Sequence, residues 1–327
     1  MLSILSVSFP FFALIACGYG AARCGLLALA AIPALNSFVL FFALPCMLYR
    51  FGASAPVAEL LAPGVVLTYL LGALLMVGVC LGLTRRGALG WNDAAFGALV
   101  AAFPNTGFMG VPLLVALWGP AAASPVIVSL LVDMVLTTSL CIALSRLGSH
   151  ASPSGAPALR AGQAARKALR GVLANPLPWA ILAGALVSWQ ALPVPRPLAS
   201  TIGLLADAAS PVALFTLGAV LARAPTAPAG APALPWRSTL PLAALKLFVH
   251  PVLVWGLGLA LQALGLPLDR FAFKVLVLAA ALPSASNVVL LAERYGADSG
   301  RIARIIVQST VCAFFSFCGA VALLGGA

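Results

Sequence analysis

The sequence predicts an all-α integral membrane protein, and three observations support this fold class. Only 8% of the 327 residues are charged, whereas about a quarter of residues are charged in an ordinary soluble domain. Hydrophobic residues make up 63% of the chain and the mean hydropathy is +1.12, so the surface has too few charges to face water. The apolar residues also gather in stretches of about 20, the length that a helix needs to cross a bilayer.

Ten such stretches, separated by Gly, Pro and charged residues, predict ten transmembrane helices. They cover residues 3–22, 32–51, 60–83, 91–118, 121–145, 175–192, 200–222, 239–262, 270–294 and 301–325. No basic residue precedes the first stretch, so we expect a retained span rather than a cleaved signal peptide. The two longer connections, 148–172 and 223–238, are rich in Pro, Ala and Gly and are expected to be solvated loops.

Basic residues orient these spans. Thirteen fall in one set of loops: Arg23, Arg85, Arg86, Arg146, Arg160, Arg166, Lys167, Arg170, Arg223, Arg237, Arg294, Arg301 and Arg304. Only Arg50, Arg196 and Arg270 fall in the other set. Because cytoplasmic loops carry the basic excess, we expect a multi-pass protein of the cell inner membrane, with both termini outside in the periplasm and the loop 148–172 in the cytoplasm. The net charge of +11 then records topology and indicates no nucleic acid partner.

Several kinds of chemistry lack the residues that they need. The seven cysteines lie mostly in apolar runs without CxxC spacing, and the chain has only two histidines, so neither a metal site nor a cofactor is expected. No G-x-x-x-x-G-K-[ST] motif occurs, which excludes ATP-driven pumping by this chain. Nothing resembles a G-x-S-x-G nucleophile elbow.

The chain contains an internal repeat. The segment AAFPNTGFMGVPLL at 101–114 resembles AALPSASNVVLL at 280–291, and their prolines, Pro104 and Pro283, lie 179 residues apart. Each half would hold five spans. Because five is odd, the second half enters the membrane from the opposite side, which gives an inverted repeat. We expect a first five-helix repeat at 1–147, a linker at 148–172 and a second repeat at 173–327.

Each mid-span proline is followed by small polar residues. Proline removes a backbone donor and disrupts the preceding turn, and broken backbone at membrane depth is tolerated only inside protein or beside a wet cavity. Two breaks at corresponding positions of an inverted repeat indicate the substrate site of a transporter, although each proline could also simply kink a packed span. The candidate binding and crossover residues are Pro104, Asn105, Thr106, Gly107, Pro283, Ser284, Ser286 and Asn287.

Few ionisable residues lie inside the stretches, and each costs about 2.5–3.5 kcal/mol at membrane depth. Asp133 either pairs with Lys246, binds a coupling cation or relays protons. Lys246 and His250 are four residues apart and share one helix face. Lys246 either attracts a carboxylate or snorkels to the interface, and His250 either titrates near neutral pH or is structural. Asp207 and Asn36 either face the substrate or form interhelical hydrogen bonds.

Four segments carry a family resemblance that extends over nearly the whole chain. They are PNTGFMGVP at 104–112, LPSASNVVLLAERYG at 282–296, NSFVLFFALPCMLY at 36–49 and KLFVHP at 246–251. Together with the tenfold span layout, they resemble the auxin efflux carrier family, which includes plant PIN-type auxin carriers and bacterial malonate and malate carriers. The chain lacks the long hydrophilic central loop of the plant members and is similar to the bacterial type.

The resemblance implies a fold similar to bile-acid sodium symporters and NhaA-type proteins. Spans 1, 2, 6 and 7 would form a scaffold, and spans 3–5 and 8–10 a mobile transport part. Spans 4 and 9 would cross at their prolines beside the substrate, with the family's crossover residues carried over to Pro104, Asn105, Pro283 and Asn287. A homodimer through the scaffold spans, and coupling to protons or sodium, stay open.

Three functions are weighed. The leading hypothesis is a secondary carrier that moves a small organic anion, such as a mono- or dicarboxylate, by elevator-type alternating access, and a sodium-coupled symporter of the bile-acid type is its alternative. An intramembrane enzyme would use Asp133 and Asp207 as a carboxylate pair. A receptor would need a signalling domain from a partner. The carrier requires the two broken segments to converge, whereas the enzyme requires the two aspartates to converge.

Overall fold

A computed structural model describes residues 2–54, 59, 62–86, 89–147, 175–223 and 236–325. These residues form helices and a single isolated antiparallel bridge. The predicted linker 148–172 and most of the predicted loop 223–238 lie outside the described residues. Seven described helices are long and apolar enough to cross a membrane: Leu5–Arg23, Leu29–Ser54, Pro63–Arg85, Pro120–Ser145, Arg196–Ala222, Leu240–Ala263 and Ser299–Gly325.

The α-helical elements follow one another along both halves. The first half holds α1 (Leu2–Arg23), α2 (Ile32–Phe38), α3 (Leu44–Ser54), α5 (Pro63–Arg86), α6 (Trp91–Ala102), α7 (Val111–Trp118), α8 (Ala123–Val132) and α9 (Thr138–Ser145). The second half holds α11 (Pro176–Trp189), α12 (Arg196–Arg223), α13 (Leu240–Ala244), α14 (His250–Ala263), α15 (Arg270–Ala281), α16 (Asn287–Tyr295) and α17 (Ser299–Gly325).

Short turns of other helical types lie between these elements. The 3₁₀ turns are η1 (Leu29–Ala31), η4 (Pro120–Ala122) and η7 (Trp236–Ser238). The π turns are η2 (Val39–Ala43), η3 (Thr106–Gly110), η5 (Asp133–Thr137) and η8 (Leu245–Val249). Single π turns inside α-helices are often found at functional sites, so the positions of η3, η5 and η8 are considered below.

Local sequence explains several helix ends. Proline stands in the first turn of α11 and α13, where its missing N–H costs nothing because that group would be unpaired anyway. The Asn175 side chain accepts from the Leu177 amide at the start of α11, and the Asp269 side chain accepts from the Ala272 amide at the start of α15. Gly296 ends α16 in the left-handed conformation, with φ 69°, as glycine commonly does at this position.

Three predicted spans are not among the seven long helices. The predicted spans 91–118 and 270–294 each consist of two shorter helical pieces separated by a break, and 175–192 corresponds to the 14-residue α11. The breaks divide two of these spans into short pieces, and α11 is too short to cross a bilayer by itself, so seven of the described helices have spanning length. The ten-span topology and the inverted relation between the halves stay predictions.

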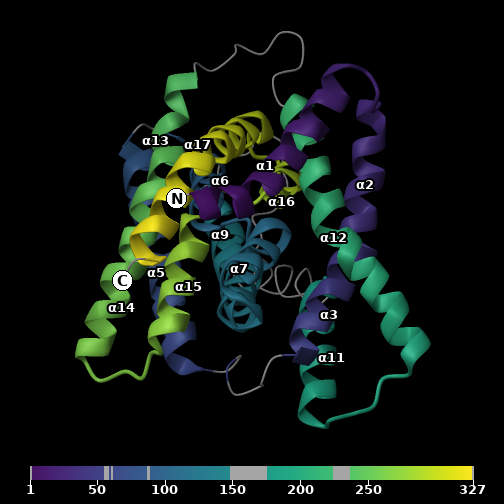
Figure 1. Ribbon diagram of the computed structural model, residues 1–327. Coiled ribbons are helices and arrows are strands. Elements are labelled where there is room, and N and C mark those ends of the chain that lie inside the picture. Colours follow the sequence, from purple (N-terminus) through teal and green to yellow (C-terminus); the bar gives the residue numbers. More distant parts are fainter. Residues whose placement is uncertain are drawn as a thin grey trace.

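The helices pack in two groups. The first group contains α1, α2, η2, α3, α11 and α12, with extensive contact between α1 and α12 and between α3 and α11. Figure 1 shows α2, α3, α11 and α12 together on the right of the molecule. Glycines make the first of these contacts close. A Cβ at Gly18 would meet the backbone of Phe215, and a Cβ at Gly218 would meet the backbone of Ile15.

The second group contains α5 to α9 and α13 to α17, whose members contact one another along their lengths. Figure 1 shows α5, α14 and α15 on the left, with α6, α7 and α9 between them and the first group. Residues 94–102 of α6 and 275–281 of α15 are all buried. A helix that is apolar and buried all round belongs to the core, so α6 and α15 form the centre of the second group.

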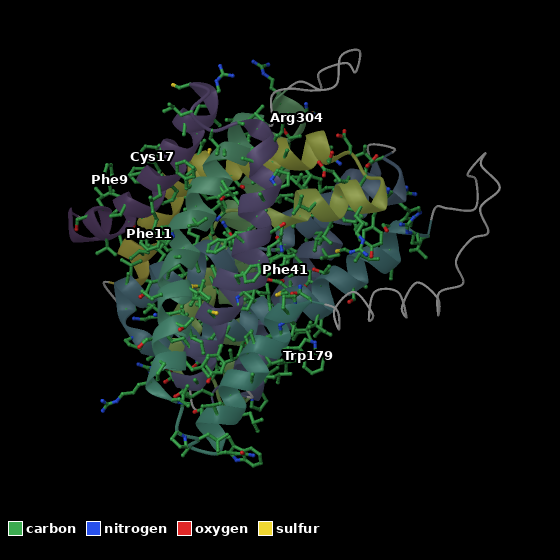
Figure 2. The ribbon with its side chains drawn as sticks, turned by 90° about the vertical axis from the view of Figure 1, so that its right-hand side faces the viewer. Phe9, Phe11, Cys17, Phe41, Trp179 and Arg304 are labelled. Carbon is green, nitrogen blue, oxygen red and sulfur yellow. The ribbon has the colours of Figure 1, made fainter. Side chains whose placement is uncertain are left out.

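The outer surface of the molecule is apolar. Phe9 on α1 is 62% exposed, and Phe41 on η2 and Trp179 on α11 are also exposed. Figure 2 shows Phe41 and Trp179 on the face that carries the first group. Large exposed apolar surfaces mark membrane or protein contacts. Together with the seven long apolar helices, this surface indicates a multi-pass membrane protein.

Candidate functional site

Both mid-span prolines break their helices. α6 ends at Ala102 and α15 at Ala281, and the next residues, Phe103 and Leu282, are extended, with ψ of 102° and 156°. Each of these residues precedes a proline, whose ring disfavours helical backbone at the position before it. Helical structure resumes at Thr106 in η3 and at Asn287 in α16. The alternative of two simple kinks is therefore wrong.

The two breaks pair with each other through the backbone. The Asn105 amide donates to the Pro283 carbonyl at 2.7 Å, and the Ala285 amide donates to the Phe103 carbonyl at 3.0 Å. Pro104 and Ser284 thus form an isolated antiparallel bridge. Buried backbone polar groups must find partners, and here each break partners groups that the other leaves free. We call residues 103–106 and 282–287 the crossing.

Polar side chains at the crossing keep unused hydrogen-bonding capacity. The Asn105 Nδ2, Ser284 Oγ and Asn287 Oδ1 atoms are buried and have no hydrogen-bond partner. The Ser284 amide, in contrast, donates to Ser309 Oγ of α17 at 3.2 Å. An unpartnered buried polar group costs about 1–3 kcal/mol, and such groups call for an explanation in a native structure. Of these three residues, Asn287 alone lines the neighbouring cavity, where a donor group of a bound molecule would satisfy its Oδ1.

A cavity of about 360 Å³ lies beside the crossing. It opens between the two helix groups, since α2 and α12 line it on one side and η3 and α16 on the other. Its lining residues are Ile32, Pro33, Asn36, Ser37, Phe108, Val220, Ser286, Asn287, Val289, Leu290 and Glu293. This size and mixture of apolar walls with a few polar groups is typical of small-molecule sites.

The structure separates the predicted crossover residues into two sets. Ser286 and Asn287 line the cavity, and Asn36 of α2 faces them across it. Pro104, Asn105, Thr106, Pro283 and Ser284 are buried in the crossing itself, and Gly107 lies in η3 against Leu130 and Leu44. The lining residues Ser37, Phe108 and Glu293, and the crossing contact Ser309, were not predicted. Nothing in the local sequence distinguishes them from the polar or aromatic residues beside them.

A second group of polar side chains is sealed inside the second helix group. The Lys246 side chain is fully buried, and its Nζ donates to the Ala280 carbonyl at 2.7 Å and lies 3.0 Å from His250 Nδ1. The alternative in which Lys246 snorkels to the interface is therefore wrong. His250 is fully buried as well, and its Nε2 has no partner.

Asp133 lies in the same interior. Its Oδ2 accepts from the Tyr69 hydroxyl at 2.6 Å and its Oδ1 accepts from Thr137 Oγ1 at 3.0 Å. The Tyr69 and His250 rings are 6.1 Å apart, which places Asp133 and Lys246 around one interior. The two charged groups interact electrostatically, but these two described residues form no direct ion pair. We call Tyr69, Asp133, Thr137, Lys246 and His250 the buried cluster.

Two π turns place the charged members of the buried cluster. Asp133 opens η5 and Lys246 is the second residue of η8. A π turn inserts an extra residue into the helical ladder and so redirects a side chain relative to an unbroken helix. The Thr138 hydroxyl accompanies η5 by donating to the Asp133 carbonyl at 2.7 Å. Tyr69 was not predicted. It is the seventh residue of α5, and nothing in the sequence around it indicates a partner on another helix.

Asp207 has a different environment from Asp133. Its carboxylate accepts from Arg50 at 2.6 Å, joining α12 to α3, and both side chains are substantially exposed. The two aspartates therefore belong to different helix groups and have separate partners. The part of the chain that the structure describes holds no group of three or more His, Cys, Asp or Glu side chains that could bind a metal ion.

Known proteins resemble this chain along most of its length. The family model described as "Membrane transport protein" matches residues 4–320. A Rhizobium meliloti protein named "Putative malonate transporter" is 29% identical over 99% of this chain and 97% of its own length. An "Uncharacterized transporter" of Methanothermobacter thermautotrophicus is 30% identical over 67% of this chain and 64% of its own length. The "Uncharacterized transporter YfdV" of Escherichia coli K12 is 25% identical over 62% of this chain and 59% of its own length.

Proposed function

Because the chain belongs to the membrane transport protein family, we propose that it is a secondary carrier of a small organic anion. The single observation that carries this proposal is the pairing of the two broken helices, in which the Asn105 amide bonds to the Pro283 carbonyl beside a cavity. Paired broken helices next to a cavity are the arrangement in which transporters hold substrates.

The end of α16 that lines the cavity favours a small carboxylate, and Glu293 is the one acidic side chain among the described lining residues. The N-terminus of α16 lies in the cavity wall, where Ser286 and Asn287 stand, and helix N-termini attract anions through their free amides and dipole. Asn287 also lines the cavity, and its amide N–H group could donate to a carboxylate, whereas its Oδ1 only accepts. The Rhizobium meliloti relative is named for malonate. A mono- or dicarboxylate of malonate size is the substrate class that we infer.

The two helix groups suggest how the substrate would cross. The cavity lies between them, with Asn36 and Val220 on the first group and Phe108 and Asn287 on the second. In an elevator mechanism the second group would act as the transport part and slide against the first, carrying the crossing with it. The ten spans would form inverted repeats in the inner membrane, with both termini outside and the 148–172 loop cytoplasmic. The exposed aromatic face of the first group would serve a homodimer or lipid.

Counterflow in proteoliposomes tests this function. Vesicles containing the purified protein are preloaded with an unlabelled mono- or dicarboxylate, and entry of the same labelled anion is followed against protein-free vesicles. We expect malonate or a close relative to exchange, because exchange needs only binding and alternating access. If no carboxylate of the panel exchanges while the protein is folded and monodisperse, the proposed function is wrong. Exchange that requires sodium on both sides would favour the sodium-coupled symporter.

A further inference from the structure

The buried cluster has no role in the substrate site described above. Asp133, Lys246 and His250 are each 0% exposed, and none of them lines the cavity. Ionisable groups inside a membrane protein are costly and are retained mainly for ion pathways, relays or binding. Building on the proposed carrier function, we propose that Asp133, Lys246 and His250 form a proton-binding site that couples anion uptake to proton entry.

The first support is the way in which the two charges are held. Lys246 and Asp133 balance each other in net charge, yet each has its own neutral partners: the Ala280 carbonyl for the ammonium, and the Tyr69 and Thr137 hydroxyls for the carboxylate. Burying a charge without a direct counter-ion is expensive. Because no direct ion pair needs to be broken, a proton can bind the Asp133 carboxylate and change the net charge of the cluster from zero to plus one.

The second support is the unpartnered nitrogen of His250. The Lys246 ammonium can only donate, so His250 Nδ1 must accept, and the neutral ring then carries its proton on Nε2. That Nε2 is buried without a partner. The site therefore keeps one N–H group ready for an acceptor such as a water molecule when the interior opens. In this arrangement, His250 holds the Lys246 ammonium in place by accepting from it, and the incoming proton binds the Asp133 carboxylate.

The surroundings contain few other titratable groups. Apart from the three themselves, Tyr69 and Cys80 on α5 and Cys141 on α9 interact with them. Asp133 on η5 and His250 on α14 each interact with Lys246 on η8. Thiols and phenols are ordinarily protonated at neutral pH. Among the residues that the structure describes here, the Asp133 carboxylate is therefore the anionic group that a proton entering the site can bind.

The third support is a direct link to the crossing. The Ala280 carbonyl that accepts from Lys246 lies in the last turn of α15, three residues before Pro283. The last carbonyls of a helix lack helical partners and carry partial negative charge. When Asp133 gains a proton, the charge of Lys246 is no longer balanced, and the excess positive charge at the end of α15 stabilises an anion in the adjacent crossing. All members of this chain of contacts belong to the second group.

Proton-driven uptake into proteoliposomes tests the proposal. The probe is labelled malonate, with the membrane potential clamped at zero by potassium and valinomycin, and the interior made more alkaline than the medium. If one proton accompanies each anion, a gradient of about one pH unit drives up to about tenfold accumulation, since one unit is 1.36 kcal/mol. Malonate should also carry protons inward, which an entrapped pH dye would record as acidification.

A matched pair of variants locates the proton. Asp133→Asn keeps the size of the side chain and removes its proton acceptor, so it should lose pH-driven accumulation and keep counterflow. Asp269→Asn makes the same change at the exposed N-cap of α15 and should accumulate malonate as the wild type does. Accumulation by Asp133→Asn equal to that of the wild type would overturn the proposal.

If Asp133→Asn does not fold, measurements on the wild type alone still test the proposal. Wild-type protein that exchanges malonate but neither accumulates it under the pH gradient nor acidifies the interior would overturn the proton site and leave the carrier intact. Accumulation driven only by a sodium gradient would overturn it as well. If the wild type exchanges neither malonate nor any other carboxylate, the carrier function itself is refuted.

Discussion

The crossing and the buried cluster lie in the same helix group, but they use opposite chemistry. The crossing is uncharged: backbone amides and carbonyls pair Asn105 with Pro283, and neutral side chains face the cavity. The buried cluster is built from ionisable groups, including Asp133 and Lys246, and is sealed from the cavity. Neutral groups tolerate repeated opening to water better than desolvated charges do, because moving a charge between water and protein is expensive.

This difference predicts a division of tasks. The crossing should set which anion binds, because Ser286 and Asn287 at the α16 N-terminus line the cavity. The buried cluster should set what drives transport, because its charge can change while the cavity keeps its shape. Changes in the cluster should therefore affect driven uptake, and changes in the crossing should affect affinity.

Lys246→Met should have the largest effect. It removes the ammonium, leaves the Ala280 carbonyl without its partner and leaves the Asp133 carboxylate without a compensating charge. Removing one member of a buried charged set costs about 3–5 kcal/mol, so we expect a large loss of thermal stability in detergent and of transport in every mode. Lys274→Met on α15 is the control. Undiminished transport by Lys246→Met at equal protein levels would contradict the role of this cluster.

Asn287→Ala should have the next largest effect, and it should fall on affinity. Its side chain lines the cavity, where its amide N–H group could donate to a carboxylate. Loss of one hydrogen bond to a charged ligand corresponds to about 1.5–3 kcal/mol, or roughly a tenfold or greater rise in the concentration that half-saturates counterflow. Asn175→Ser, which retains a cap at the start of α11, serves as the control. An unchanged half-saturation would separate Asn287 from the substrate.

Gly110→Ala tests the packing of the crossing. A Cβ at Gly110 would lie 2.6 Å from Leu282 Cδ1, so the leucine must shift beside the second break. Overpacking of this kind costs about 1–3 kcal/mol, and a flexible side chain as the neighbour puts the expected loss of stability at the lower end. Gly78→Ala on α5 meets nothing within 4 Å and should be neutral or stabilising. Equal melting temperatures of the two variants would contradict tight packing at this point.

Asp207→Asn should have the smallest effect. The Arg50–Asp207 pair is substantially exposed, and exposed pairs contribute about 0–1 kcal/mol. We expect a small change in melting temperature and retained pH-driven uptake, in contrast to Asp133→Asn. Loss of transport in Asp207→Asn would contradict this expectation and would indicate that Asp133 and Asp207 act together.

The crossing could be predicted because its causes are local. A proline acts on the residue before it and on the preceding turn, so Pro104 and Pro283 identify the breaks without knowledge of the fold. The family resemblance and the carrier hypothesis predicted that the two breaks meet, and the Pro104–Ser284 bridge shows that they do. Long apolar stretches predicted ten spans, and seven helices of spanning length are found among the described residues.

The buried cluster could be predicted only in part, because its causes are not local. The depth of Lys246 depends on how its helix is rotated, and the π turn η8 changes that rotation within one turn. Periodicity treats a helix as regular, so snorkelling and burial of Lys246 could not be separated. The Tyr69 to Asp133 hydrogen bond joins residues 64 positions apart, and no spacing rule connects them. The cavity lining combines four separate elements for the same reason.

Substrate protection of a cysteine in the cavity tests the central claim most directly. Ser37 lines the cavity from α2, and Ser37→Cys is labelled with a thiol reagent after the exposed Cys17, Cys24 and Cys312 are replaced by serine. Phe9→Cys, on the exposed side of α1, is the control. The account predicts that a transported carboxylate slows labelling at position 37 and leaves labelling at position 9 unchanged. Equal labelling of Ser37→Cys with and without that carboxylate would contradict a substrate site at the crossing.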